Sequence, residues 1–373
     1  MTSRKVFILA AVAIAVLTAA LLLSRKESSQ VSKPSAALYP SLKSELNSVT
    51  AIRIFKASDA RSVELTRKDA DWSVSERAGY PADAGKARRL LLALADARTV
   101  EEKTSNPASY PALSVEDVSS ASATGSRIEL AGVATPVNLI VGKSAGAKGS
   151  YVRRAGEPVS WLIDQSIEAS SAPNEWLRTS ILDVGADRVQ AATVATEGAK
   201  PYTAQKAARA DADFKPDFVV PKGKELDKFA INGFANALTA LTLSDVHPAK
   251  DFEADKPAAH TTFRTFDGLV VDLDGWTKDG KHYLSATTGY DEAQAARFHV
   301  DTKAPEKAAD AKPESPAAAK PAPADNEKPN DKAKAMDAQL KGWVYEVPDY
   351  KYEAIFKPAA SLTKDAAPPA KKQ

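Results

Sequence analysis

A serine flanked by glycines is the residue whose surroundings most resemble a catalytic motif. Gly142-Lys143-Ser144-Ala145-Gly146 matches G-x-S-x-G, in which a tight turn between a strand and a helix exposes a nucleophilic serine. Apolar residues before the motif fit the strand, but turn residues and a second strand pattern at 151–154 follow where the helix should begin. The pattern therefore predicts a glycine-rich hairpin loop rather than a nucleophile elbow.

The same segment resembles the end of a phosphate-binding loop. In G-x-x-x-x-G-K-S, the first glycine would fall at position 137, where the chain has a valine. Without that glycine the backbone cradle for the phosphates is incomplete, so we expect no nucleotide site.

Four aspartates lie among glycines in a pattern that suggests a calcium loop. They are Asp267, Asp272, Asp274 and Asp279. Their spacing lacks the alternating ligands, sixth-position glycine and twelfth-position acid of an EF-hand. Asp274-Gly275 and Asp279-Gly280 are typical of hairpin turns, because both residue types tolerate positive φ. We expect turns here, with opportunistic calcium binding as the alternative.

Residues that bind zinc are scarce. The chain has no cysteine, which excludes disulfides, iron–sulfur clusters and cysteine nucleophiles. The four histidines are not spaced i, i+2 or i, i+4; they are His247, His260, His282 and His299. Two of the 48 acidic residues could form a glycosidase pair, but nothing in the sequence selects them. We therefore predict no catalytic, cofactor-binding or metal-binding residues, no cofactor, and no enzyme activity.

Five tryptophans either fill the core or line a ligand groove. They are Trp72, Trp161, Trp176, Trp276 and Trp343. All are expected at strand ends or turns, and core filling is favoured because alanine supplies much of the 44% apolar content.

Length and charge narrow the class of protein. The chain has 373 residues, which allows two domains. Its 50 basic and 48 acidic residues give a net charge of +2, which argues against a nucleic-acid partner. The sequence does not indicate an oligomeric state.

The N-terminus contains an uncharged apolar run. Residues 6–23 would form a helix of roughly 27 Å, close to the thickness of a bilayer. Arg4 and Lys5 precede the run, so the positive-inside rule predicts a cytoplasmic N-terminus (1–5), a membrane anchor (6–23) and a periplasmic bulk. This makes the membrane a partner and predicts a single-pass protein of a bacterial inner membrane. A cleaved signal peptide is the alternative.

A polar linker (24–46) separates this run from two units with the same order of elements. In the first unit (47–184), a helix is predicted over 84–97 among short strands at 51–55, 62–67, 72–74, 126–130, 137–141, 151–154 and 161–164. In the second unit (185–357), a helix over 227–241 follows strands at 189–196, 201–207 and 214–220. Tyr151-Val152 and the run 161–164 find echoes in Tyr283-Leu284 and the run 343–346. The predicted fold class is therefore α+β, with an N-terminal transmembrane helix and two similar units, each an antiparallel sheet with a covering helix.

The second unit carries an insert of unusual composition. Residues 301–338 contain 12 Ala, 6 Pro, 7 Lys and 8 acidic residues, but no Leu, Ile, Val or aromatic residue. Such a segment buries too little apolar surface to offset the entropy of ordering, so we predict a disordered loop before a strand at 342–347. It either serves as a flexible strap or is a neutral insertion. The tail 358–373 is also expected to be flexible.

Several short motifs resemble one family. Their succession is Asp71-Trp72-Ser73-Val74, Tyr80-Pro81-Ala82-Asp83, Leu139-Ile140-Val141-Gly142, Tyr151-Val152-Arg153, Trp161-Leu162-Ile163-Asp164 and Trp176-Leu177-Arg178. Over residues 50–182 this order is similar to the bacterial domain of unknown function 4340. Leu113-Ser114-Val115 departs from the expected Gly-Leu pair. The resemblance implies a single-pass envelope protein with α+β domains, similar in some members to auxiliary parts of gliding-type ABC transport systems, and no known catalytic residues.

Together these features predict a non-enzymatic, membrane-tethered periplasmic accessory or scaffold protein. It would use sheet faces or strand edges to engage an envelope or ABC-transport-type complex. A periplasmic module that binds cell-wall glycan or another polymer through exposed Trp and Tyr is the alternative. An envelope hydrolase is the second alternative.

Overall fold

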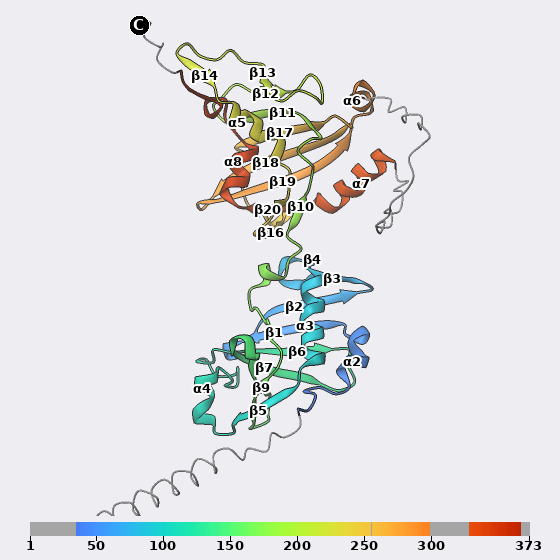
Figure 1. The fold of residues 1–373 in the computed structure, drawn as a ribbon, viewed down its shortest axis with the longest axis vertical. Helices are drawn as coiled ribbons and strands as arrows, with labels where there is room; N and C mark the ends of the chain where they lie inside the picture. The colour runs from blue at the N-terminus through green and yellow to red at the C-terminus, as the bar shows by residue number, and fades with distance from the viewer. Residues whose placement is uncertain (1–34, 255, 299–327, 367–373) are drawn as a thin grey trace, which may run out of the picture. The chain divides into compact units, whose positions relative to one another are not determined.

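The computed structural model describes residues 35–254, 256–298 and 328–366 (Figure 1). The chain forms two compact units. The first contains residues up to Trp72 and Ala84–Pro173, and the second contains Ser73–Asp83 and the residues from Asn174 onward. The main division therefore falls near Pro173, whereas the sequence places it at 184.

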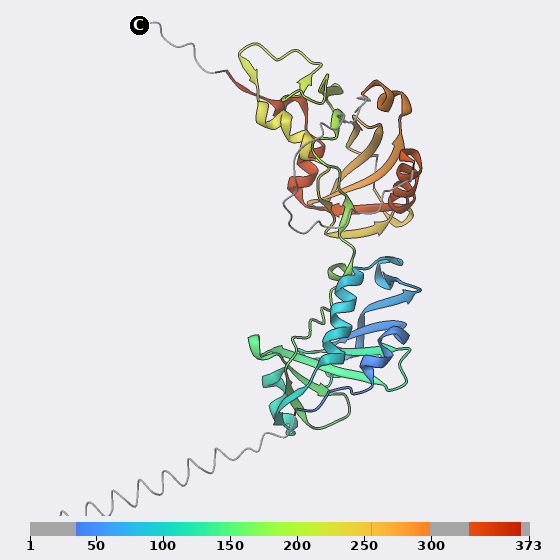
Figure 2. The same cartoon turned by 45° about the vertical axis from the view of Figure 1, so that its right-hand side comes forward.

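The first large sheet has nine strands in the order β4-β3-β2-β1-β6-β7-β8-β9-β5. They are β1 (Ala51–Lys56), β2 (Ala60–Lys68), β3 (Asp71–Val74), β4 (Tyr80–Pro81), β5 (Thr99–Thr104), β6 (Ser126–Ala131), β7 (Val137–Ser144), β8 (Ser150–Arg154) and β9 (Ser160–Ile163). Helix α3 (Ala84–Asp96) lies along one face of this sheet (Figures 1 and 2) and buries Leu90 and Leu94. The predicted first helix and the strands around it are confirmed to within a few residues.

Part of the predicted linker belongs to the packed first unit. Leu38 and Leu42 are each 1% exposed, and the Leu38 N–H donates to the Ala97 carbonyl over 2.7 Å. Helix α2 (Leu42–Glu45) and the 3₁₀ turn η1 (Leu46–Ser48) follow. Together with Tyr39, these two leucines anchor the segment to the first unit, although Ser35 and Lys43 within it stay exposed.

The second large sheet has eight strands in the order β13-β12-β11-β17-β18-β19-β20-β16. They are β11 (Val189–Thr196), β12 (Tyr202–Gln205), β13 (Lys215–Pro216), β16 (Asp245–Pro248), β17 (Ala259–Thr265), β18 (Leu269–Lys278), β19 (Lys281–Tyr290) and β20 (Trp343–Val347). Two small sheets pair β10 (Ser180–Leu182) with β15 (Leu241–Thr242), and β14 (Lys224–Leu226) with β21 (Thr363–Asp365). Short 3₁₀ turns join many strands; they are η2 (Ala57–Asp59), η3 (Ser75–Arg77), η4 (Pro107–Ser109), η5 (Gly146–Lys148), η6 (Pro173–Trp176), η8 (Ala249–Asp251) and η9 (Ala359–Leu362).

The two large sheets share one strand connectivity, as the sequence repeat predicts. In each sheet, the first strand in the chain, β1 or β11, lies inside the sheet. It pairs with the next strand in the chain, β2 or β12, on one side, and with the first strand of a four-strand meander on the other. The meander is β6 to β9 in one sheet and β17 to β20 in the other, and the strand just before it in the chain, β5 or β16, closes the sheet beyond its last strand. Tyr151 and Tyr283 occupy the equivalent strands β8 and β19, and Trp161 and Trp343 occupy β9 and β20.

The predicted fold class is wrong in its helices. The fold is mostly β-sheet with few short helices, and the helix expected over 227–241 is only α5 (Lys228–Asn232) followed by the 3₁₀ turn η7 (Gly233–Asn236). Asp227 caps α5 as predicted for a helix start. Gly233 and Asn236 have low helix propensity, and the turn they form buries Phe234 completely. The second unit therefore lacks a long covering helix.

The predicted disordered insert ends in a helix. Residues 301–327 lie outside the described residues, but α7 (Pro329–Leu340) is packed against β19. Its Asp337 carboxylate accepts from the Thr288 N–H over 3.0 Å, and Ala333 and Leu340 are buried. The prediction of disorder was based on the absence of large apolar side chains from 301–338, but the small Ala333 side chain is buried in the contact with β19. The predicted loose tail is also partly ordered, because Leu362 is fully buried and β21 pairs with β14.

The prediction of a membrane-spanning helix is contradicted. Across 35–254, 256–298 and 328–366, no helix is both long enough and apolar enough to cross a bilayer. The transmembrane fold class, the single-pass description and the inner-membrane localisation are therefore wrong for the described chain. The segment 6–23, on which they rested, lies outside the described residues.

One strand glycine makes room for the last helix of the chain. Gly275 lies within β18, and a Cβ there would be 2.7 Å from the ring of Phe356, which directly follows α8 (Asp349–Ile355). Gly289, in the neighbouring strand β19, has nothing within 4 Å of such a Cβ. Glycine at 275 therefore serves the close approach of the Phe356 ring.

Gly275→Ala is expected to destabilise the protein by about 1–3 kcal/mol, because overpacking displaces the Phe356 ring. Urea unfolding followed by circular dichroism measures the change. Gly289→Ala is the matched control, and its unfolding midpoint should stay within error of the wild type or rise. Equal effects of the two substitutions would refute the steric argument.

Candidate functional site

The glycine-flanked serine lies in a hairpin, as predicted. Strand β7 runs through Ser144, the turn η5 (Gly146–Lys148) follows, and β8 returns beside β7. The Ser144 hydroxyl accepts a hydrogen bond from the Gly146 N–H over 3.1 Å, and the Lys143 ammonium donates to the Ala112 carbonyl. Because no helix follows the motif, neither a nucleophile elbow nor a phosphate cradle forms there.

The four aspartates do not form a calcium loop. Asp279-Gly280 is the predicted hairpin turn, with φ of 52° and 74°. The same prediction for Asp274-Gly275 is wrong, because both residues lie inside β18. Asp267, after β17, pairs with Arg188 over 2.9 Å. Among the described residues, no group of three His, Asp or Glu side chains could hold a metal ion.

One described histidine lies in a chain of polar contacts on the surface of the second sheet. Nδ1 of His260 is 2.8 Å from the Asp274 carboxylate, and its Nε2 is 3.2 Å from the Thr262 hydroxyl. That hydroxyl donates to Asp272 over 2.5 Å. The order Asp–His–hydroxyl resembles a hydrolytic triad. However, the Thr262 proton is held by Asp272, and none of these four residues lines a described pocket. The contacts therefore act as cross-strand pairs.

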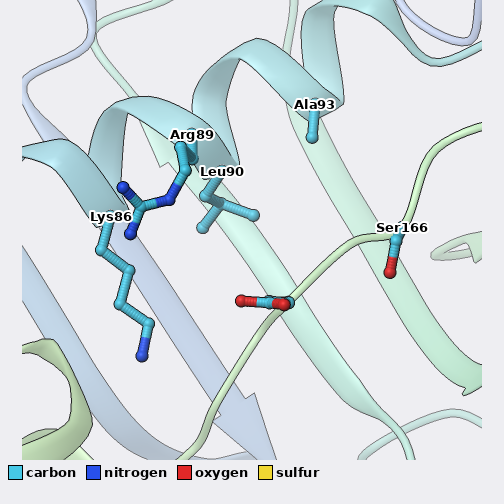
Figure 3. A pocket seen from close by; sticks show the side chains of 6 residues that line it. Lys86, Arg89, Leu90, Ala93 and Ser166 are labelled. Carbon is cyan, nitrogen blue, oxygen red and sulfur yellow. The ribbon is translucent and has the colours of Figure 1, made fainter.

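A small cavity lies beside α3 in the first unit (Figure 3). It has a volume of about 230 Å³ and is lined by Lys86, Arg89, Leu90 and Ala93 of the helix. Ser166 and Glu168, in the segment after β9, complete it. Because the Glu168 carboxylate offsets part of the cationic charge, the lining favours no ligand class.

The strongest candidate site surrounds the end of the β18–β19 hairpin in the second unit. Alternate residues of a strand point to opposite faces, so this hairpin carries two separate aromatic clusters. On the face toward which Gly275 points, the Tyr352 ring stacks on the His282 ring, with 4.2 Å between the ring centres. On the other face, the centre of the Phe252 ring lies 5.8 Å from that of Trp276 and 5.0 Å from that of Tyr283.

The cluster on the Gly275 face forms one wall of a groove of about 610 Å³. Tyr350, Tyr352 and Phe356 line it from α8 and the residue after it, and Ala230 lines it from α5. Figure 1 shows α5 and α8 side by side near this end of the hairpin. The Thr277 hydroxyl lies 3.1 Å from Nδ1 of His282, and burial raises the pKa of Tyr352. The aromatic rings of the wall are therefore fixed in place by the hydrogen bond between Thr277 and His282 and by the stacking of Tyr352 on His282.

A lysine crosses the floor of this groove. The Lys357 ammonium donates to the Ala230 carbonyl over 2.8 Å and lies 5.0 Å from the centre of the Phe234 ring. A Cβ at Gly233 would be 2.5 Å from this ammonium, so glycine permits the approach. Burial lowers the pKa of Lys357. Two of its three N–H donors remain beyond the bond to Ala230 and could serve a bound carbonyl.

The outer strand beside the second cluster is fixed by an ion pair. Arg77 donates two parallel hydrogen bonds to the Asp245 carboxylate of β16, over 2.6 and 2.7 Å. Burial acts to raise the pKa of Asp245, but the bonds from Arg77 and from the Val246 N–H together lower it. Both side chains are less than one quarter exposed, so solvent screens the pair only partly.

The edges of both large sheets are unsuited to accepting another strand. β4, β13 and β16 are short and end in proline, which cannot donate to a ladder. β5 pairs with β9 with two irregularities in register. These are the devices by which sheets avoid edge pairing. The sequence expectation of binding through strand edges is therefore less favoured than binding through a groove.

Sequence reasoning did not select the groove. Tyr350 and Tyr352 carried no motif, and Phe229, which is 91% exposed beside Ala230, was assigned to a long helix. Two of the five tryptophans, Trp72 and Trp176, are buried as core filling predicts, and Trp161, Trp276 and Trp343 are half-buried. A useful signal was the i, i+2 pair of tyrosines just after a strand.

Asp245→Asn is expected to lower the free energy of unfolding at pH 7 by about 2 kcal/mol, because charge-assisted bonds to Arg77 are lost. The asparagine oxygen can still accept from the Val246 N–H. Since the folded pKa of Asp245 is lowered, its contribution is present above the unfolded pKa and is lost as pH falls through the folded value. Urea unfolding from pH 7 to pH 3 should therefore show a shrinking gap between wild type and variant.

The control for this measurement is Asp365→Asn, which removes a pair with Lys224 in which the Asp365 side chain is 89% exposed. A change of less than about 0.5 kcal/mol is expected. An Asp245→Asn gap that is equally small, or that does not depend on pH, would show that the Arg77 pair does not anchor β16.

Comparison with known proteins gives one match. A model of the family described as a domain of unknown function (DUF4340) covers residues 72–262, just over half of the chain. No curated protein and no solved structure matches the chain. The matched range begins at Trp72 and extends into the second unit, further than the motifs in 50–182 indicated. The chain therefore belongs to the DUF4340 family.

Proposed function

We propose that this protein is a non-enzymatic accessory or scaffold protein that binds an apolar segment of a partner polypeptide. The groove beside the β18–β19 hairpin is the binding site. Protein interfaces are enriched in Tyr, Phe and Trp at their centres, and a few such residues carry most of the affinity. The groove presents Tyr350 and Tyr352 from α8 and Phe356, the residue after it.

The observation that carries the proposal is the exposure of an aromatic ring in the groove. Tyr350 lines it and is 64% exposed. It is one of five large apolar side chains that are exposed among the described residues. Leaving such a ring in water costs free energy that a partner recovers by covering it.

The chemistry of the groove favours a polypeptide over a reacting substrate. Lys357 and Glu353 are its two charged lining residues, and Ser361 turns its hydroxyl to the Pro358 carbonyl. No nucleophile in this lining is hydrogen-bonded to a base. The Lys357 ammonium can donate to a main-chain carbonyl of the partner while the aromatic rings hold its side chains.

Family membership suggests the kind of partner. The motifs of this chain resemble family members that are similar to auxiliary parts of gliding-type ABC transport systems. We therefore propose a subunit of an ABC-transport-type complex as the partner. Such a role needs a stable surface and no catalytic residue.

A photo-crosslinking amino acid at position 350 is expected to trap one defined partner in intact cells, because the Tyr350 side chain lies at the groove. Mass spectrometry of the crosslinked band identifies the partner. The same probe at Val219, which is 92% exposed but does not line the groove, is the matched control and should give no such band.

With the probe moved to position 353, whose Glu353 side chain also lines the groove and is exposed, Tyr350→Ser should remove the band without changing the unfolding midpoint, because the Tyr350 ring is 64% exposed in the free protein. Identical bands from positions 350 and 219, or a band at position 353 that survives Tyr350→Ser, would contradict the groove as the binding site. Substrate turnover by the purified protein would contradict the non-enzymatic role.

A further inference from the structure

A second pocket lies on the opposite face of the β18–β19 hairpin. It has a volume of about 610 Å³ and is lined by Trp276, Thr277, Lys278, Glu197, Glu253 and Lys256, together with two alanines. This volume lies within the usual range for small-ligand sites. One large aromatic side chain surrounded by carboxylates and ammonium groups is an uncommon lining for a sheet surface.

The aromatic face of this pocket is fixed by its neighbours. The Trp276 ring meets Phe252 edge to face, and Phe252 is held in turn by Tyr283 and by the Lys278 ammonium 5.6 Å from its ring centre. The same ammonium donates to the Glu253 carbonyl over 2.5 Å. The Ala258 N–H donates to the Gly275 carbonyl, and the Glu197 N–H donates to the Ala258 carbonyl. These two bonds join the lining residues Glu197 and Ala258 to β18. The site is therefore largely formed before a ligand arrives.

The internal repeat shows that the pocket is not a by-product of the fold. Val152 pairs with Val141 in β7, and its counterpart Leu284 pairs with Gly275 in β18. This correspondence places Gly142 of the first unit at the position of Trp276. At Gly142 a Cβ would lie 2.8 Å from Val115, so a covering segment closes the surface there.

The covering segments differ in length as well. Between the edge strand and the meander, the first unit has the 21 residues 105–125, which include α4 (Tyr110–Leu113). The second unit has only the 10 residues 249–258 at this position. Beside the shorter connection Trp276 is half-buried and lines the pocket, at the position where the first unit needs glycine.

The charges of the described lining residues of this pocket cancel. Two carboxylates, Glu197 and Glu253, and two ammonium groups, Lys256 and Lys278, give these residues no net formal charge. All four side chains are exposed. Such a lining offers both donors and acceptors but attracts neither an anion nor a cation strongly.

We infer that this pocket binds a neutral saccharide, with one pyranose ring stacked on Trp276. The C–H face of a pyranose is apolar and weakly positive, which matches the negative face of an indole ring. Its hydroxyls both donate and accept, which matches the carboxylate and ammonium groups around the ring. This site lies on the opposite face of the hairpin from the proposed polypeptide groove and does not depend on it.

Calorimetric titration of the full chain with cellohexaose, maltohexaose and the fully N-acetylated chitohexaose, all of them uncharged, tests the inference. At least one of them is expected to bind at low millimolar concentration or better. Trp276→Leu should weaken that binding about tenfold, whereas Trp276→Tyr should keep most of it because a ring remains for stacking. Glu197→Gln combined with Glu253→Gln should also weaken it about tenfold and keeps the side-chain shapes.

Tyr350→Ser, in the polypeptide groove, is the control and should leave saccharide binding unchanged. This control separates the two proposals, because each can fail while the other stands. No heat from any of the three oligosaccharides at low millimolar concentration would overturn the inference. Binding that is insensitive to both Trp276→Leu and the double glutamine variant would also overturn it, and the latter variant remains informative if the former does not fold.

Discussion

The seating of the Phe356 ring on Gly275 is the contact on which the candidate site depends. Three consecutive residues fix the chain after α8 to different elements. The Ile355 carbonyl accepts from the buried Thr261 hydroxyl of β17, the Phe356 ring fills the space at Gly275, and the Lys357 carbonyl accepts from the Tyr202 hydroxyl. Burial raises the pKa of Tyr202, so this hydroxyl stays protonated and donates at neutral pH. Without this seating, the wall made by α8 would have no fixed position.

Strand alternation explains how one hairpin can serve two separate surfaces. Gly275 and His282 face α8, whereas Trp276 and Tyr283 face Phe252, so the two clusters share a backbone but no side chain. Ten-residue strands on both sides of Asp279-Gly280 keep this pattern in register to the end of the hairpin. The two surfaces can therefore bind different ligand classes from one rigid element.

The strands were predictable because their signals are local. Alternating apolar residues located β1, β2 and β11, and the Leu-rich face of 84–97 located α3, each from one stretch of sequence. The errors arose where tertiary contacts decide the outcome. The helix expected over 227–241 ends at Asn232, because Gly233 and Asn236 have low helix propensity and the turn they form buries Phe234 in the core. Helix α7 was missed because its contact surface is alanine, which carries little periodic signal although Ala333 is 2% exposed.

The groove and the pocket on the opposite face were beyond prediction for a related reason. Ala230 and Tyr350 of the groove and Trp276 of the pocket come from three separate parts of the chain, and none lies in a catalytic motif. The motif that did stand out, around Ser144, occupies in the first unit the position of the Asp279-Gly280 hairpin in the second. A comparison of the two halves was the sequence signal that could have found the Trp276 pocket. It places Gly142 of the first unit at the position of Trp276 in the second. A tryptophan exchanged for the glycine at this position would clash with a covering segment such as 105–125, so the second unit must lack such a segment there.

That exchange indicates how the two halves came to differ. In the first unit a long connection buries Val115 and Tyr110 over the sheet, and the buried Arg153 guanidinium donates to the Val115 carbonyl over 2.8 Å. In the second unit the connection is shorter by half, and its Phe252 packs against Trp276 and Tyr283. The sheet surface that Val115 and Tyr110 cover in the first unit thus borders a pocket in the second unit. Because both copies keep the same strand connectivity, the stability of the second sheet does not require the closure. The side chains that line this pocket can therefore differ from one protein to another without loss of the sheet, as residues of a binding site do.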